Sequence, residues 1–512
     1  MSKSAISPIR AENYPEWYQA VIKAADMAEL SGVRGCMVIK PWGYAIWERV
    51  QNVLDGMIKA TGHDNCYFPL FIPLSYFQKE ATHVEGFAKE MAIVTHHRLI
   101  NKNGELVPDP DSKLDEPLIV RPTSETIIGE AMARAVQSYR DLPLLWNQWA
   151  NVVRWEMRTR MFLRTAEFLW QEGHTAHADE ADARAETERM LEVYRALIED
   201  YIAMPAIQGS KPESEKFAGA EDTLTLEVMM QDGRALQSCT SHYLGQNFAQ
   251  AANIQFQGKS GSLELCHTTS WGLSTRVIGG LIMTHADDDG LVLPPKLAPQ
   301  QVVIVPILRD ETAREAVLNY CDKLATDIAA QTYAGEAVRV KVDKRDEESA
   351  TKRWNWIKKG VPVILEVGPK DIEKDGVAVT RRDDVAGKKT FPARAEFIAG
   401  LPALLDEMQR GIYARALEMQ KSRTRTDIKT WAEFETYFGK DTDGKFDEAP
   451  GFVRAPWSGD EAATEAKIKP LGVTIRCLPF DTNVPDHAAV PSGNCIITGG
   501  AAKYEAIFAR AY

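Results

Sequence analysis

The sequence predicts three units: an α+β domain over residues 1–295, an α/β domain over 300–407 and a small α+β domain over 410–512. Three observations support this division. Strand-like and helix-like patterns are interleaved up to about residue 290, a proline-rich stretch follows at 291–299, and strands then alternate with helices. A proline-rich stretch is typical of a boundary. Regular alternation predicts a mostly parallel sheet with right-handed crossovers.

Apolar periodicity predicts the individual elements. In the first domain we expect helices over residues 14–30, 42–61 and 178–202. In the second domain we expect, in chain order, a strand at 301–308, a helix at 311–331, a strand at 337–343, a helix at about 348–359, strands at 361–368 and 377–382, and a closing helix. The third domain should begin with a charged helix and end in short strands.

Composition limits the class of protein. A chain of 512 residues that is 45% hydrophobic can bury large cores. It has no run of ~18 apolar residues, so we expect no membrane span. The start lacks the apolar core of a signal peptide, and the seven cysteines form no CxxC pair, so we expect reduced thiols and a cytoplasmic location. A net charge of −12 argues against indiscriminate nucleic-acid binding but leaves room for a local basic patch.

The most informative segment is residues 152–168, predicted as a β-hairpin with a cationic loop. Arg154 and Glu156 would share one face of the first strand, because alternate side chains of a strand point the same way. Phe168 on the returning strand offers a flat surface for a base. This pattern fits a nucleotide site, although a surface strand pair with solvated charges would show the same residues.

The hairpin resembles motif 2 of the class II aminoacyl-tRNA synthetases, which is Arg-x-Glu, a loop, then Arg-x-x-x-Phe. Residues 62–73 resemble motif 1, and residues 271–280, with Arg276, resemble motif 3. Three motifs in the right order are far more specific than any one of them. The resemblance implies a catalytic domain built on an antiparallel sheet.

Over the full chain the sequence is similar to the prolyl-tRNA synthetase family, in its archaeal/eukaryotic-like form. The residues that carry this resemblance are the blocks 121–126, 168–174, 232–237, 240–242 and 360–369 and the terminal Tyr512. The stretch from 177 to 232 is too short for the editing insertion of the bacterial form. The resemblance implies ATP-dependent activation of L-proline and its transfer to tRNA(Pro).

The resemblance also implies roles for individual residues. Proline would be bound by Thr123, Glu125, Arg154 and His242. ATP would be bound by Arg154, Glu156, Arg164, Thr165, Phe168, Gln237, Thr240, Ser274 and Arg276. Arg154 and Arg276 would be the catalytic pair, acting on the α- and γ-phosphates with Mg²⁺.

Several of these residues have ordinary structural alternatives. The Thr-Ser pair before a helix starting at Glu125 could serve as an N-cap. His242 could be a satisfied core histidine, and Trp271 could belong to the core or wall the proline ring. Tyr512 could fold back toward the catalytic domain or end in a frayed terminus.

The 300–407 domain resembles the anticodon-binding domain of the family. Its basic side chains could form a local face for tRNA phosphates, and Trp354 or Trp356 could stack on bases. Those basic side chains are Lys341, Lys344, Arg345, Lys352, Arg353, Lys358 and Lys359. The alternative is a solvated face with two buried tryptophans.

The last domain departs from the family at a zinc site. Related enzymes place four cysteines where this chain has Ser458, Ala463, Cys495 and Thr498. One thiolate cannot build a tetrahedral site. Cys477 and His487 could substitute, but their spacing matches no pattern. We therefore expect no structural zinc.

Two other functions were weighed. An enzyme for threonine, serine or histidine fits the 123–125 and 240–242 blocks poorly. A binding or regulatory protein that lost ligation should have lost a motif arginine or the anticodon-like domain, and both are present. Family resemblance also implies a homodimer, with motif 1 at its interface.

Overall fold

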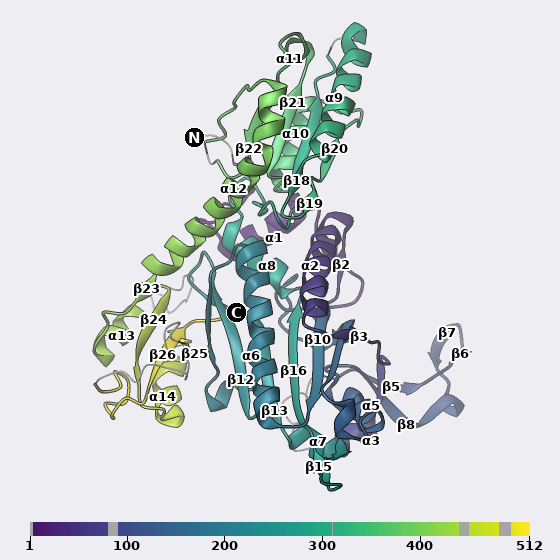
Figure 1. The fold of residues 1–512 in the computed structure, drawn as a ribbon, viewed down its shortest axis with the longest axis vertical. Helices are drawn as coiled ribbons and strands as arrows, with labels where there is room; N and C mark the ends of the chain where they lie inside the picture. The colour runs from purple at the N-terminus through teal and green to yellow at the C-terminus, as the bar shows by residue number, and fades with distance from the viewer. Residues whose placement is uncertain (1–3, 80–90, 310, 385, 440–449, 481–492) are drawn as a thin grey trace.

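The computed structural model describes residues 4–79, 91–309, 311–384, 386–439, 450–480 and 493–512. An eleven-stranded sheet runs through the lower part of the molecule (Figure 1), in the order β23-β24-β26-β25-β11-β12-β13-β16-β10-β9-β3. Its strands are β3 (Asp64–Asn65), β9 (Leu144–Val153), β10 (Glu167–His177), β11 (Ala206–Ser210), β12 (Asp222–Met229), β13 (Ala235–Gly245), β16 (His267–Ser274), β23 (Thr424–Arg425), β24 (Phe452–Trp457), β25 (Thr474–Pro479) and β26 (Tyr504–Ala509).

From β11 to β9 each strand is antiparallel to the next one in the sheet, which confirms the predicted antiparallel catalytic domain, and the short edge strand β3 is parallel to β9. The helices of this domain are α1 (Tyr14–Ala24), α2 (Pro41–Ala60), α3 (Leu74–Lys79), α5 (Glu125–Ala135), α6 (Glu180–Ala196), α7 (Asn247–Ala252) and α8 (Arg276–His285). Helix α6 begins at the Asp179 cap and packs Met190, Leu191 and Tyr194 into the core. The buried side of the sheet is thereby closed, which leaves its other side for a site.

Short strands complete this domain. They are β1 (Ala28–Leu30) with β2 (Met37–Ile39), β4 (Phe71–Pro73) with β8 (Lys113–Val120) and β5 (Ile93–His96), β6 (Leu99–Lys102) with β7 (Glu105–Pro108), and β14 (Gln255–Gln257) with β15 (Leu263–Leu265). The predicted helix over 14–30 is too long. It ends at Ala24 because Asp26 takes a left-handed conformation (φ 56°) before β1.

The predicted hairpin also needs a correction. Strand β9 ends at Val153, so Arg154 and Glu156 lie in the loop and not on a strand. The Glu156 amide donates to the Arg154 carbonyl at 2.6 Å, a tight turn that ends the strand geometry. Their positions therefore come from the loop.

The α/β unit stands apart at the top of Figure 1, with its own sheet in the order β20-β17-β21-β22. The strands are β17 (Val302–Pro306), β20 (Val340–Val342), β21 (Val363–Val367) and β22 (Ala378–Arg381), beside the small pair β18 (Thr332–Tyr333) and β19 (Glu336–Ala337). The first three strands are parallel, as predicted, and β22 is antiparallel. Its helices are α9 (Arg314–Ala329), α10 (Ser349–Lys358), α11 (Pro369–Glu373) and α12 (Arg394–Ser422).

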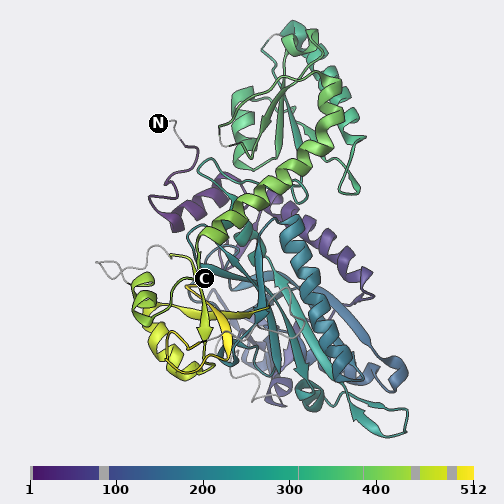
Figure 2. The same cartoon turned by 60° about the vertical axis from the view of Figure 1, so that its left-hand side comes forward.

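Helix α12 runs from the α/β unit down to the C-terminal strands, a path that is clearest in Figure 2. The boundary predicted between 407 and 410 falls inside this one helix, and the division of the chain stays a prediction. Two further helices, α13 (Trp431–Tyr437) and α14 (Glu461–Ile468), pack on the C-terminal strands. No helix in the described part of the chain is both long and apolar enough to cross a membrane.

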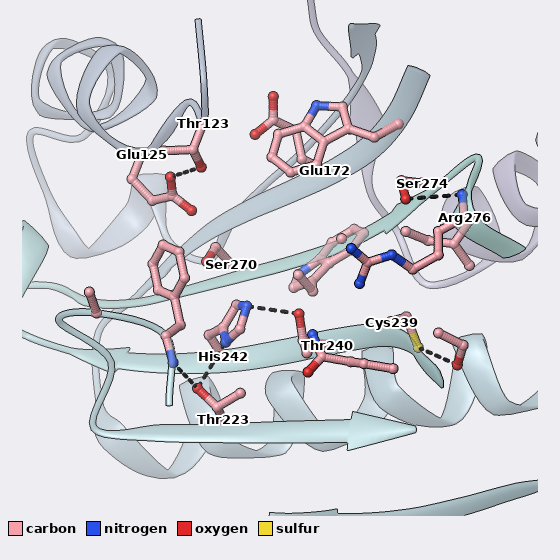
Figure 3. A pocket seen from close by; sticks show the side chains of 18 of the residues that line it. Thr123, Glu125, Glu172, Thr223, Cys239, Thr240, His242, Ser270, Ser274 and Arg276 are labelled. Carbon is pink, nitrogen blue, oxygen red and sulfur yellow. Dashed lines mark hydrogen bonds between the residues drawn. The ribbon is translucent and has the colours of Figure 1, made fainter. Parts of the chain in front are cut away.

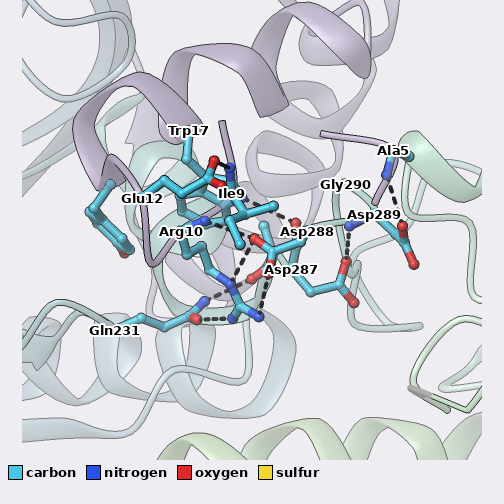
Figure 4. Close-up of polar contacts among 12 residues, drawn as sticks. Ala5, Ile9, Arg10, Glu12, Trp17, Gln231, Asp287, Asp288, Asp289 and Gly290 are labelled. Carbon is cyan, nitrogen blue, oxygen red and sulfur yellow. Dashed lines mark hydrogen bonds and ion pairs between the residues drawn. The ribbon is translucent and has the colours of Figure 1, made fainter. Parts of the chain in front are cut away.

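The catalytic domain, the amino-terminal segment and the α/β unit meet at the turn after α8. Figure 4 shows the contacts of the amino-terminal segment with this turn. Arg10 donates from Nε to Asp288 at 3.2 Å and from Nη1 to Gln231 at 2.5 Å. The carboxylate of the neighbouring Asp287 accepts hydrogen bonds from both terminal nitrogens of Arg382, the residue that follows β22. This acidic turn therefore joins three segments that are far apart in the sequence.

Candidate active site

A cavity of about 380 Å³ opens on the face of the antiparallel sheet (Figure 3). Its walls come from the start of α5, from β10, β12, β13 and β16, and from the start of α8. It brings together nine of the predicted site residues, namely Thr123, Glu125, Arg154, Phe168, Gln237, Thr240, His242, Ser274 and Arg276. The three others, Glu156, Arg164 and Thr165, line an adjoining hollow of about 170 Å³.

The start of α5 supplies one end of the cavity. The hydroxyl of Thr123 donates to the carboxylate of Glu125. Ser124 stands at the N-cap but makes no capping bond, because its hydroxyl donates to Glu172 at 2.5 Å. The capping alternative is therefore wrong for this segment, and Thr123 and Glu125 both face the cavity.

Strand β10 adds three residues that the sequence analysis did not assign. Trp170, Glu172 and His174 alternate along the strand after the predicted Phe168, and all four line the cavity. The alternation was visible in the sequence, because residues two apart on a strand share a face. Gly173 between them is required, since a Cβ there would come within 2.0 Å of the Trp271 ring.

Glu172 and His174 form a buried pair at this end. A nitrogen of His174 lies 2.9 Å from the Glu172 carboxylate, which also accepts from Gln148 at 2.7 Å. Burial opposes ionisation of Glu172, but these hydrogen bonds hold its pKa below the usual value. Burial likewise opposes a charged His174, yet the neighbouring Glu172 raises the pKa of that ring. The pair therefore holds a carboxylate and an imidazole ring against each other near Glu125.

His242 is satisfied on both nitrogens. Nδ1 lies 3.0 Å from the Thr223 hydroxyl and Nε2 lies 3.0 Å from the Thr240 hydroxyl. Burial lowers the pKa of His242 to about 3, helped by the nearby His174. Phe217, another cavity residue that was not predicted, lies against the ring at 4.7 Å. His242 is therefore a neutral wall of the cavity, as well as a residue with satisfied partners.

Trp271 is both a core residue and a wall of the cavity, which were the two alternatives that the sequence left open. Its side chain is buried and packs edge-on against His63 and Tyr194. It also lines the cavity. The neighbouring hydroxyl of Ser270 points into the cavity and has no hydrogen-bond partner within the described ranges. An unsatisfied buried hydroxyl favours a polar ligand.

Arginines dominate the other end of the cavity. Arg154 donates from Nε to the Pro122 carbonyl at 3.0 Å, and its guanidinium lies 5.7 Å from the Phe168 ring and 5.5 Å from Trp170. Arg276 opens α8 and donates from Nε to Leu163 at 3.2 Å. Burial, reinforced by Arg154 and Arg164, lowers the pKa of Arg276 to about 10. Like charges crowded at a helix start favour a bound anion.

The adjoining hollow holds an ion pair. Arg164 donates to the carboxylate of Glu156, which also accepts from the Arg158 amide at 2.6 Å. Burial opposes ionisation of Glu156, but these contacts lower its pKa. Both residues of this pair are among those predicted to bind ATP, and the Glu156 carboxylate keeps lone pairs that could accept a further hydrogen bond from a ligand.

The end of the chain packs against the catalytic domain. The Tyr512 hydroxyl donates to Asp232, and its ring lies 5.4 Å from the guanidinium of Arg160 and 5.6 Å from that of Arg234. Its backbone amide donates to Ala235 at 3.1 Å. The fold-back alternative therefore holds for Tyr512, beside the arginine end of the cavity.

The predicted basic face of the α/β unit is only partly exposed. Lys352 is buried and donates to the Asp343 carbonyl at 3.2 Å, while the Trp356 indole donates to the Asp343 carboxylate at 2.8 Å. These two residues hold the loop after β20 in place, so they cannot contact RNA as predicted. Trp354 remains 36% exposed and is the tryptophan that a base could reach.

Three of the four zinc-ligand positions come together in the C-terminal unit. The hydroxyls of Ser458 and Thr498 lie 3.0 Å apart, and the Thr498 amide donates to the Cys495 sulfur at 3.4 Å. The fourth position, Ala463, carries no donor side chain. Of the two substitutes, Cys477 is buried elsewhere against Met229 and Phe452, and His487 lies outside the described residues. Nowhere in the described ranges do three or more His, Cys, Asp or Glu side chains form a metal site. The absence of structural zinc stays a prediction.

Three family models match the chain: the class II tRNA synthetase core domain (G, H, P, S and T) over 109–285, the anticodon binding domain over 301–401 and the prolyl-tRNA synthetase C-terminal domain over 441–512. A proline–tRNA ligase of Anaeromyxobacter dehalogenans is 59% identical over 516 residues, covering 100% of this chain and 99% of the relative. A proline–tRNA ligase of Paramagnetospirillum magneticum is 54% identical over 510 residues, with coverage of 100% and 99%.

A crystal structure of prolyl-tRNA synthetase from Cryptosporidium parvum, complexed with L-proline and AMP, has a TM-score of 0.86 and 35% identity. The match covers 99% of this chain and 97% of the chain in that crystal structure. The relatives and the solved structure each match 99% or more of this chain. The chain belongs to the prolyl-tRNA synthetase family.

Proposed function

We propose that the cavity activates L-proline with ATP and that the chain then transfers the prolyl group to tRNA(Pro). The observation that supports this most is the polarity of the cavity. One end holds Glu125, Glu172 and a neutral His242, and the other holds Arg154 and Arg276. A secondary ammonium fits the acidic end and a triphosphate fits the arginine end.

In the first step the proline carboxylate attacks the α-phosphate of ATP. A new bond forms between a carboxylate oxygen and phosphorus, the bond to the β-phosphate oxygen breaks, and pyrophosphate leaves. Arg154 belongs to the arginine end, but it donates to the carbonyl of Pro122, the residue before Thr123, so it can contact both the carboxylate and the α-phosphate. Arg276 at the start of α8 holds the far phosphates. Positioning and charge stabilisation therefore carry the step, without a covalent enzyme intermediate.

Mg²⁺ fits the wall between these groups. Gln237 and Thr240 line the cavity with an amide and a hydroxyl, and such oxygens suit Mg²⁺ when ATP phosphates and water supply its remaining ligands. The bound ion would neutralise phosphate charge. Phe168 would stack on the adenine, with Glu156, Thr165 and Arg164 around it in the adjoining hollow.

In the second step the 3′-hydroxyl of the terminal tRNA adenosine attacks the activated carbonyl, and AMP leaves. The anticodon binding domain supports tRNA as the partner. Lys341, Arg353 and Trp354 remain candidates for phosphate and base contacts on the α/β unit. We propose the cytoplasm as the compartment, because tRNA is charged there and all seven cysteines are free thiols.

A homodimer stays part of the proposal. Large apolar side chains are exposed around the motif 1 strands, including Tyr67 at 74%, Phe71 at 46% and Ile93 at 58%. Exposed apolar groups that lie close together often mark a protein interface. Light scattering should give twice the subunit mass of 57.1 kDa, and a monomer would contradict this part.

Proline-dependent ATP–pyrophosphate exchange tests the function. Arg154→Ala should lower exchange by at least ~100-fold, the scale of one preorganised charge contact. Arg134→Ala is the matched control, because that arginine pairs with Glu130 on the exposed side of α5. A folded wild type that exchanges with no amino acid would overturn the proposal.

A further inference from the structure

The C-terminal unit is continuous with the catalytic sheet. Strand β25 pairs with β11, so that Gly209 faces Pro479 and Ser210 faces Leu478. The two backbones approach closely, since a Cβ on Gly209 would lie 2.4 Å from the Leu478 carbonyl oxygen. A change in the C-terminal strand is therefore passed directly to β11 and β12.

At this seam the C-terminal unit inserts a charge into the catalytic domain. Arg476 on β25 donates from Nε to Glu227 of β12 at 3.0 Å. Lys211 donates to the other oxygen of Glu227 at 2.7 Å and to the Arg476 carbonyl at 2.9 Å. The side chains of Lys211 and Glu227 are 0% exposed and that of Arg476 is 7% exposed. These three residues form a buried triad with a net charge of +1.

The triad lies beside the nucleotide end of the cavity. In the register of β12 and β13, Glu227 stands opposite Gln237 and Thr225 stands opposite Thr240. Thr225 also donates to Glu227 at 3.1 Å, so the triad holds the strand that carries both cavity residues. Thr223, on the same face of β12, contacts His242 and lines the cavity.

The charges of the triad also act on the cavity. The pKa of Arg276 is lowered first by burial, then by the charges of Arg154 and Arg164, and then by that of Arg476. The negative charge of Glu227 raises the pKa of Arg276 and so opposes these effects. Burial opposes ionisation of Glu227, but Arg476 and Lys211 lower its pKa to about 2. Glu227 is therefore ionised at neutral pH and offsets part of the positive field.

We infer that Arg476, a residue of the C-terminal unit, is a positioning residue for ATP binding in the catalytic cavity. The inference rests on the proposed function. Arg476 fixes Glu227, which fixes the β12–β13 wall that presents Gln237 and Thr240 to the nucleotide. If the ion pair were purely structural, removal of Arg476 would leave the buried charge of Glu227 without its partner and would lower the stability of the fold. Binding of ATP and of proline would then be affected equally.

The test is steady-state exchange with ATP and proline varied separately. Arg476→Met should raise the KM for ATP by about tenfold and leave the KM for proline within about twofold. Arg476→Lys should restore part of the loss because it keeps the charge. Arg454→Met is the matched control, since Arg454 forms an ion pair with Glu505 between β24 and β26, inside the C-terminal unit.

A second variant keeps the test decisive if Arg476→Met does not fold. Lys211→Met, Glu227→Gln and Arg476→Met together remove every charge of the triad, so they leave no buried charge unpaired. A raised KM for ATP in this folded variant supports the positioning role. Unchanged KM values in either folded variant overturn it, as does an equal rise for ATP and proline. Failure of the proposed function would look different, because wild type would then show no proline-dependent exchange.

Discussion

The two units attached to the catalytic domain are joined to it in different ways. The C-terminal strands extend the catalytic sheet and place Arg476 against the buried Glu227. The α/β unit has a separate four-stranded sheet, and it is joined by side-chain contacts and by backbone hydrogen bonds from Leu291 to Lys358 and from Leu293 to Gly360. Arg382 binds Asp287, the rings of Trp42 and Trp356 lie 5.8 Å apart, and the Trp42 indole donates to the Lys359 carbonyl at 3.1 Å.

This difference indicates a division of work. A shared sheet transmits small displacements, because neighbouring strands are locked in register. A junction without a shared sheet leaves the attached unit to bind its own partner with little effect on the cavity. We therefore expect the C-terminal unit to serve activation and the α/β unit to serve tRNA.

The largest expected loss of activity comes from a substitution inside the cavity, and the effects of substitutions in the two attached units are compared with it. Arg276→Ala removes a buried charge at the start of α8, where phosphates would bind. We expect kcat/KM for exchange to fall by about 100- to 1,000-fold, or roughly 3–4 kcal/mol. A fall of less than tenfold in correctly folded protein would mean that Arg276 does not contact the nucleotide.

The α/β unit offers the next effect. Trp354→Ala removes an exposed ring and should weaken tRNA charging by about tenfold, since stacking on one base contributes ~1–3 kcal/mol. Proline-dependent exchange without tRNA should not change. Trp356→Ala is the contrasting variant, because its indole is bonded to Asp343 and its loss should lower the melting temperature. Equal charging defects without loss of stability would contradict this assignment.

A smaller effect concerns the pH dependence of stability at the Glu172–His174 pair. The pKa of Glu172 in the folded protein is lowered from 4.5. The stabilisation of the fold by ionised Glu172 is therefore present above pH 4.5 and is lost as the pH falls through the folded-state pKa. The pKa of His174 in the folded protein is raised from 6.5. The stabilisation of the fold by protonated His174 is therefore present below pH 6.5 and is lost as the pH rises through the folded-state pKa. The advantage of wild type over Glu172→Gln should therefore be greatest between pH 4.5 and 6.5. Urea unfolding across pH measures it, and a pH-independent difference would exclude a charged pair.

The smallest expected effect on activity is at the lost zinc positions. Wild type should contain no stoichiometric zinc by elemental analysis, because only Cys495 supplies a thiolate there. Ser458→Cys, Ala463→Cys and Thr498→Cys together should bind one zinc per chain and leave proline exchange unchanged. Stoichiometric zinc in wild type would contradict the interpretation of this cluster.

Motifs in the sequence predicted most of the cavity, because Arg154, Arg276 and the residues around them occur at spacings with a chemical reason. Glu172 and His174 were not assigned, although alternation from Phe168 along β10 would have placed them on the same face of the strand. Arg476 could not be predicted, since its function depends on a strand pairing with β11 from the other end of the chain. Lys352 and Trp356 were misassigned because local charge pattern does not show burial, and the end of β9 was misplaced because one tight turn decides it.

The most direct test of the division of work measures exchange and tRNA charging side by side in Arg476→Met and Arg382→Ala. We predict that Arg476→Met impairs both reactions at low ATP, because both require activation. Arg382→Ala should impair only charging, by a few-fold, since it loosens the junction at Asp287. If Arg382→Ala lowers exchange as much as Arg476→Met does, the two units are not coupled to the cavity in different ways, and the account is wrong.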